Sequence, residues 1–191
     1  MKLSTLTLSI FAAGAFALSS GCTMMDRSTS TAAQDGTMRT SQQQLDRADE
    51  NFLENAAQSG HAEIEGSQLA LTKARSPEVK DFAQQMIQDH SMVNQELTAL
   101  AQQKGYMPPT EPSVMQRAEL KTLSVTDDSF DRLYASRIGV AAHESAVKLF
   151  REASTNAMDP DVRAFAAKNL PALEQHLEMA RRLQQSVSRN Q

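Results

Sequence analysis

The sequence has one cysteine, no tryptophan, and few of the residues that interrupt helices. Its 191 residues include only seven glycines and six prolines. Cys22 has no partner for an internal disulfide, so packing alone must hold the fold together. Scarce glycine and proline, together with abundant alanine, leucine, glutamine and glutamate, favour helices over strands. The length suits one domain with terminal extensions.

The sequence also lacks any run of lysine or arginine. With a net charge of −4, it has no basic segment that could bind the phosphates of a nucleic acid, and we exclude nucleic acid as a partner. It contains no Ser/His/Asp nucleophile set, no glycine-rich phosphate loop and no cysteine pair. No enzymatic reaction is therefore predicted, and its protein partners stay unknown.

The first 22 residues are predicted to be a signal peptide. Residues 3–18 are apolar, but they are too short and too often interrupted by Ser and Thr for a membrane span. Residues 18–22 (Leu-Ser-Ser-Gly-Cys) resemble a bacterial lipobox whose leucine lies one position too far from the cysteine. We favour lipidation of Cys22, because the only cysteine of the chain directly follows the apolar stretch.

The alternative is ordinary signal cleavage. The small residues Ala15 and Ala17 fit that pattern, and cleavage before Leu18 would release a secreted protein. If Cys22 is lipidated instead, the following Thr23 favours the outer membrane by resemblance to bacterial sorting rules. We thus expect a periplasmic location, with a lipid anchor as the only membrane contact. Residues 23–45 are rich in Ser, Thr, Gln and Ala and are predicted to be a disordered tether.

Four long amphipathic helices are predicted in the rest of the chain, at residues 46–75, 76–104, 126–156 and 159–188. The connector between the second and third helices contains three prolines and a short helix at about 113–123. It is long enough to travel the length of a bundle. The fold class is therefore all-α, a four-helix bundle over 46–188 with a long connector between helices 2 and 3.

Each predicted helix carries one polar residue near the midpoint of its apolar face. These residues are Glu63, His90, His143 and His176. Because midpoints coincide whichever way the helices run, the four side chains should meet at one level inside the bundle. Three imidazoles and a carboxylate suit a transition metal ion, and the set does not choose among Zn, Cu, Fe and Mn. Met86 and Met179 lie nearby and could offer soft ligands, although methionine at helical spacing is usually core.

The competing interpretation is a structural or protein-interaction module of the cell envelope that binds no ligand. A histidine on an apolar face is more often a core residue bonded to a neighbour. The two interpretations predict different geometry: ring nitrogens within about 5 Å of one another favour a metal, since the metal–nitrogen distance is about 2.0–2.1 Å. Imidazoles that each bond a separate backbone carbonyl favour the module.

A carboxylate-bridged di-iron centre is not expected. Such centres use Glu-x-x-His on two helices, and the residues three positions before the inner histidines are Ile87, Val140 and Leu173. Ferroxidase chemistry of that type therefore lacks its carboxylates. Asp89, next to His90, faces the flank of its helix, where it could bond a neighbouring helix.

Three motifs carry a resemblance to a known family. They are Asp-His at 89–90, Phe-Asp-x-x-Tyr at 130–134 and Leu-Pro-x-x-x-x-His at 170–176. Over roughly residues 46–184 the chain resembles the bacterial domain of unknown function 4142. That family is placed in the ferritin-like superfamily, and its members are commonly exported or lipidated. The resemblance implies a ferritin-like bundle and export, and it implies no established activity.

Overall fold

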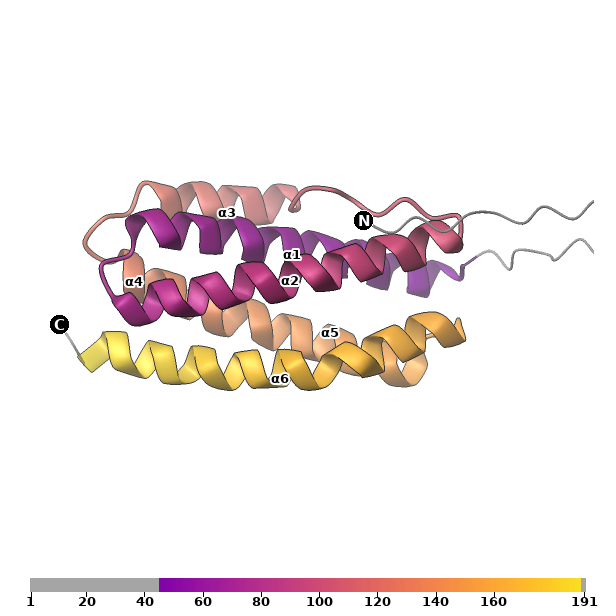
Figure 1. Cartoon of the computed structure of the whole chain (residues 1–191). Coiled ribbons are helices and arrows are strands. Elements are labelled where there is room, and N and C mark those ends of the chain that lie inside the picture. The colour runs from indigo at the N-terminus through magenta and orange to yellow at the C-terminus, as the bar shows by residue number, and fades with distance from the viewer. Residues whose placement is uncertain (1–44, 190–191) are drawn as a thin grey trace, which may run out of the picture. The chain divides into compact units, whose positions relative to one another are not determined.

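The computed structural model describes residues 45–189, and this part of the chain is all-α, with five helical rods and no strand (Figure 1). Three of the four long rods are single helices. The fourth consists of three consecutive helical segments, and the middle segment is π-helical. The elements are α1 (Arg47–Lys73), α2 (Pro77–Gln103), α3 (Val114–Ser124), α4 (Phe130–Tyr134), the π-helical η1 (Ala135–Ala141), α5 (Ala142–Asn156) and α6 (Pro160–Arg189).

Side-chain caps at the helix starts confirm the predicted start signals. Asp46 accepts the amide of Ala48, and Ser76 accepts that of Val79. Such caps satisfy amides that have no partner inside the helix. Asp159 caps α6 in the same way, directly before Pro160. The predicted short helix in the connector is also present, as α3.

The third long rod begins at Phe130, not at residue 126 or 127 as the sequence predicted. The carboxylates of Asp127 and Asp128 are held by Lys73 and Arg75 at the end of α1, at 3.0 and 2.8 Å. The segment before Phe130 therefore turns back toward α1 instead of continuing a helix. These contacts join residues more than 50 positions apart in the sequence, so local periodicity does not contain them.

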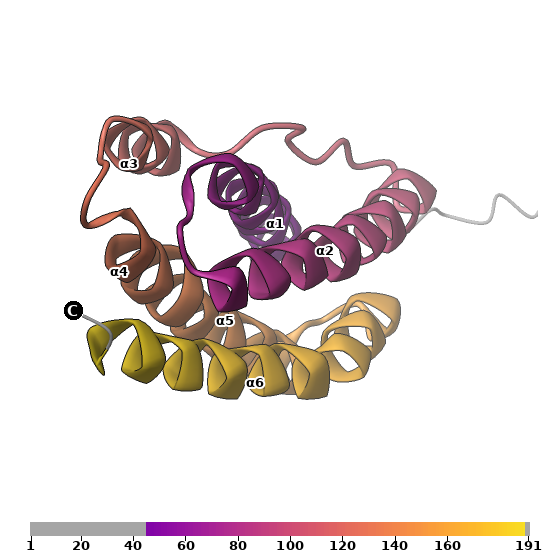
Figure 2. The ribbon, with the colours of Figure 1, turned by 60° about the vertical axis from the view of Figure 1, so that its left-hand side comes forward.

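Two apolar clusters fill the bundle, one toward each end. The first gathers the N-terminal half of α1, the C-terminal part of α2, α5 and the first half of α6; the second gathers the opposite halves together with α3, α4 and η1. The helices pair α1 with α2 and α5 with α6, and α1 also contacts α5 while α2 contacts α6 (Figure 2). The predicted polar residues lie between the two clusters. Leu45, assigned to the tether from the sequence, is buried in the first cluster.

The N-terminal predictions fall outside the described residues. The signal peptide at 1–22, lipidation of Cys22 and nearly all of the tether lie before Leu45. Among the helices of the described part, none combines the length and apolarity that crossing a membrane requires.

Candidate metal centre

Three buried imidazoles converge between the two apolar clusters. His90 comes from α2, His143 from α5 and His176 from α6, and their relative exposures are 3%, 0% and 5%. One ring nitrogen from each lies within 4.8 Å of the others. The ring centroids are 5.4 to 5.6 Å apart. The structure therefore brings all three predicted histidines to one place.

His90 is held from behind by Glu63 of α1. Its Nδ1 lies 3.0 Å from Glu63 Oε2, while its Nε2 faces His143 Nε2 at 3.4 Å. The carboxylate therefore contacts the nitrogen of His90 opposite the one that faces the cluster. Among the described residues, Glu63 does not belong to the group of convergent ligand atoms. We assign it as the hydrogen-bond partner that orients His90, a role that sequence periodicity could not distinguish from direct ligation.

His143 is oriented by the π-helical segment that precedes it. Its Nδ1 lies 2.7 Å from the carbonyl oxygen of Gly139 and 3.3 Å from that of Ile138. Where a π-helix returns to an α-helix, hydrogen bonds change from i−5 to i−4, which leaves one carbonyl without an amide partner. A carbonyl oxygen only accepts, so His143 donates from Nδ1. Its Nε2 then carries a lone pair directed toward His90.

His176 is oriented by Asp89, the residue directly before His90. Its Nε2 lies 3.0 Å from Asp89 Oδ2, and its Nδ1 is buried without any hydrogen-bond partner. The expectation that Asp89 bonds a neighbouring helix is confirmed. The sequence signal for this role was the position of Asp89 next to His90, on the flank of α2. From there its carboxylate contacts His176 of α6, and the ring of His90 contacts the same histidine. Each imidazole thus has one nitrogen committed to an oxygen atom.

Burial favours the neutral form of His90 and His176. Desolvation, followed by repulsion from His143 and His176, holds the pKa of His90 well below its usual value. Desolvation and repulsion from His143 also lower the pKa of His176, against the opposing effect of Asp89. Burial raises the pKa of Glu63, and His143 partly offsets the rise. Neutral imidazoles have the lone pairs that metal ligation needs.

Apolar and aromatic groups separate the cluster from water. Phe82 lies edge-on to His143 with ring centroids 6.1 Å apart, and Tyr134 shares a 2.9 Å hydrogen bond with the Ser67 hydroxyl. Burial raises the pKa of Tyr134, so its phenol stays protonated. Met86 is fully buried in the second apolar cluster and Met179 is packed against it. The methionines therefore serve as core around the site.

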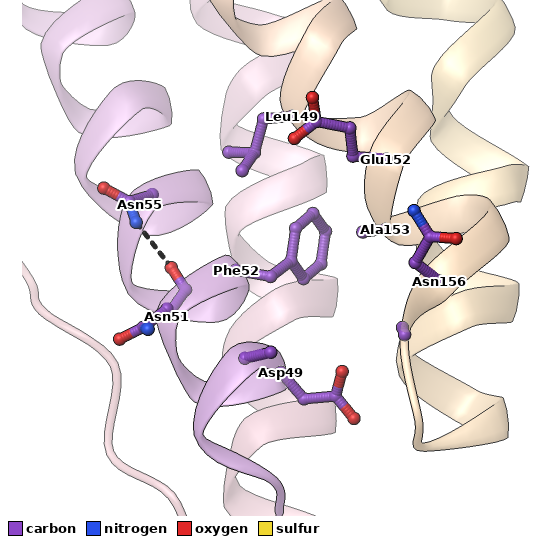
Figure 3. A pocket seen from close by; sticks show the side chains of 10 residues that line it. Asp49, Asn51, Phe52, Asn55, Leu149, Glu152, Ala153 and Asn156 are labelled. Atoms are coloured by element: carbon purple, nitrogen blue, oxygen red, sulfur yellow. Dashed lines mark hydrogen bonds between the residues drawn. The ribbon is translucent and has the colours of Figure 1, made fainter.

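A separate pocket of about 330 Å³ lies between the start of α1 and the end of α5 (Figure 3). Phe52 and Leu149 line it together with several amide side chains. Its buried carboxylate, Asp49, accepts the amides of Met158 and Asp159 at 3.1 and 2.7 Å. This carboxylate therefore links α1 to the turn before α6. None of the cluster histidines lines the pocket.

The family model of a domain of unknown function (DUF4142) matches residues 34–183. The chain belongs to this family. It matches no curated protein.

Solved structures share the fold of this DUF4142 member. A protein called CopM, solved in a Cu(I)-bound form, is 23% identical over 72% of this chain and 96% of its own, with a TM-score of 0.62. A DUF305 fragment from Deinococcus radiodurans is 14% identical over 75% of this chain and 99% of its own, with a TM-score of 0.65. A conserved hypothetical protein, rv2844, from Mycobacterium tuberculosis covers 72% of this chain and 90% of its own, at 19% identity and a TM-score of 0.57.

Proposed function

We propose that this protein binds one copper ion through His90, His143 and His176. The observation that carries the proposal is the convergence of three buried imidazoles: one ring nitrogen of each lies within 4.8 Å of the others, and every ring also has a nitrogen in contact with an oxygen atom. Metal-bound histidines usually have this second partner, which fixes the ring and leaves one lone pair for the ion. The ligand atoms are then Nε2 of His90, Nε2 of His143 and Nδ1 of His176.

The spacing fits a metal–nitrogen bond. For ligands about 2.1 Å from an ion, tetrahedral geometry places neighbouring nitrogens about 3.4 Å apart and trigonal geometry about 3.6 Å apart. The two Nε2 atoms of His90 and His143 are 3.4 Å apart. The widest separation within the group, at most 4.8 Å, needs only a small rotation of one ring to match.

The ligand type favours copper among the ions that the sequence left open. Imidazole suits copper and zinc, whereas carboxylate and water suit manganese, and copper(II) binds nitrogen sites most tightly among the divalent ions. Glu63 Oε2 is turned toward His90, so the three convergent ligand atoms are all nitrogens. CopM, whose chain is covered almost completely, was solved with Cu(I), with Cu(II) and with silver. Zinc is the second ion that three imidazoles suit.

We also propose that the domain is a ferritin-like four-helix bundle carried into the cell envelope. The long connector with α3 between α2 and α4 supports this arrangement. An N-terminal lipid on Cys22 would hold the domain at the outer membrane, in the periplasm. No catalytic residue is assigned.

The alternative, a structural or interaction module without a ligand, is supported by one feature of the same contacts. With Glu63 protonated, His90 can accept at Nδ1 and donate from Nε2 to His143, which closes the network between these two rings without an ion. This network leaves Nδ1 of His176 buried and unpaired. A buried polar atom without a partner costs free energy. A metal ion would give Nδ1 of His176 a partner, which the ligand-free network does not.

Copper titration of the protein tests the proposal. The background should be Cys22→Ser, because a free thiol is itself a soft copper ligand. We expect one copper per chain, with binding strongly weakened in His90→Ala, His143→Ala and His176→Ala. The matched control is His61→Ala, because His61 is the remaining histidine and lies outside the cluster. Absence of binding, or equal binding after all three inner histidines are replaced, refutes the proposal.

A further inference from the structure

A cavity leads from the surface to the back of the histidine cluster. It has a volume of about 360 Å³ and lies between α1, α3 and the η1–α5 rod. Small residues, among them Ala62, Ala142 and Ser145, form part of its walls. Glu63 lines it and is the innermost group, with a relative exposure of 1%.

Glu63, which lines this cavity, has one carboxylate oxygen without a hydrogen-bond partner. Oε2 is engaged with His90, but Oε1 is buried and has no hydrogen-bond partner; it lies 3.9 Å from His143 Nδ1. A buried carboxylate oxygen without a partner attracts a cation strongly, because little water competes for it. A cation at Oε1 would lie beside two of the three rings.

One weak ion pair joins two residues of the cavity lining. Glu119 of α3 and Arg137 of η1 both line it, and their side chains pair at 3.5 Å with exposures of 42% and 63%. An exposed pair of this kind contributes little stability and opens readily. Figure 2 shows α3 as a short rod beside α1 and α4, joined to α2 by a long loop.

We propose that this cavity is the route by which the metal cation reaches the histidines, with Glu63 as the first inner ligand it meets. The inference rests on the proposed function, because it concerns uptake by the same site. Glu63 then has two tasks: its Oε2 orients His90 and its Oε1 receives the incoming ion. Side-chain rotation of Glu63 and His90 passes the ion from the carboxylate to the ring nitrogens.

Stopped-flow quenching of tyrosine fluorescence by copper(II) sulfate tests the route. The chain has no tryptophan, and the ring of Phe82 contacts both Tyr134 and His143, so quenching of Tyr134 reports arrival of the ion. The blocking variant is Ser145→Phe. The matched control is Thr98→Phe in a pocket between α1 and α2 that none of the cluster residues lines. Both hydroxyls bond only the carbonyl four residues back in their own helix.

We expect Ser145→Phe to slow binding and release by the same factor, about tenfold for a barrier rise of ~1.4 kcal/mol, with the dissociation constant unchanged. Arg137→Gln should speed binding, because it removes a positive charge and frees Glu119. Thr98→Phe should change neither rate. Unchanged rates in Ser145→Phe and Arg137→Gln, or slowing only in Thr98→Phe, overturn the route while leaving equilibrium binding intact. If the parent protein binds no copper at equilibrium, the proposed function itself fails.

Discussion

Removal of Asp89 should weaken copper binding more than it weakens the fold. Asp89 accepts from His176 at 3.0 Å, and its own side chain is 26% exposed, whereas the ring is 6% exposed. In Asp89→Ala the ring loses the contact that selects which nitrogen faces the cluster. Loss of such a partner costs about 10–100-fold in metal affinity, or ~1.4–2.7 kcal/mol.

The same substitution has a smaller effect on the metal-free protein. Water can replace the carboxylate at this partly exposed position, so loss of the hydrogen bond should cost only about 0.5–1.5 kcal/mol of unfolding free energy. Asp89→Asn keeps an acceptor oxygen and should lie between the parent and Asp89→Ala in copper affinity.

Competition titration against a copper chelator measures the affinity, and urea unfolding of the apo-protein measures the stability. Asp81→Ala is the control, because Asp81 is an exposed carboxylate of the same helix that lies outside the cluster. If Asp89→Ala loses stability but binds copper as tightly as the parent, Asp89 orders only the packing of α2 on α6. The hydrogen bond between Asp89 and His176 would then have no part in metal binding.

Three further predictions concern stability. Leu53→Ala removes a fully buried side chain of the first apolar cluster and should lower the unfolding free energy by about 2–5 kcal/mol in denaturant titrations; a loss below 1 kcal/mol would contradict the packing. Asp49→Ala leaves two amides before α6 unpaired and should cost about 1–3 kcal/mol, with an unchanged midpoint as the contrary result. The folded-state pKa of His90 lies below 6.5, so its stabilising effect is complete above pH 6.5 and is lost as pH falls toward the folded-state value. The apo-protein should therefore lose stability on acidification, and less so in His90→Gln; equal slopes for the two proteins would exclude a buried neutral ring.

Three of the four long-helix starts and the level of the polar groups could be predicted because both depend on local residues. Asp46 and Ser76 cap helices whose first turns follow directly in the sequence. The histidines meet because each lies near the midpoint of its own helix, and this holds for any helix direction. Periodicity also placed Glu63 on the inner face, where the structure has it.

Other features depend on contacts that periodicity does not contain. The π-helical segment lies where Gly139 comes within 3.3 Å of the Ala180 side chain, measured from the position that a Cβ would take, and where Ile138 presses on Gly66. The residues next to Gly139 in the sequence do not indicate that Ala180 lies against it or that Gly66 lies against Ile138. Whether Glu63 reaches the ion or the back of His90 likewise depends on a difference of a few ångströms between α1 and α2.

The local environment of bound copper tests the central claim most directly. X-ray absorption at the copper edge, on Cys22→Ser protein loaded with one equivalent, reports the number and type of ligand atoms. We predict three imidazole nitrogens at about 2.0–2.1 Å, the range typical of imidazole ligation, and no sulfur. The signal should be lost from the protein after desalting when His90, His143 and His176 are replaced together. A spectrum dominated by sulfur or by oxygen alone, or one unchanged in that triple variant, would contradict the account.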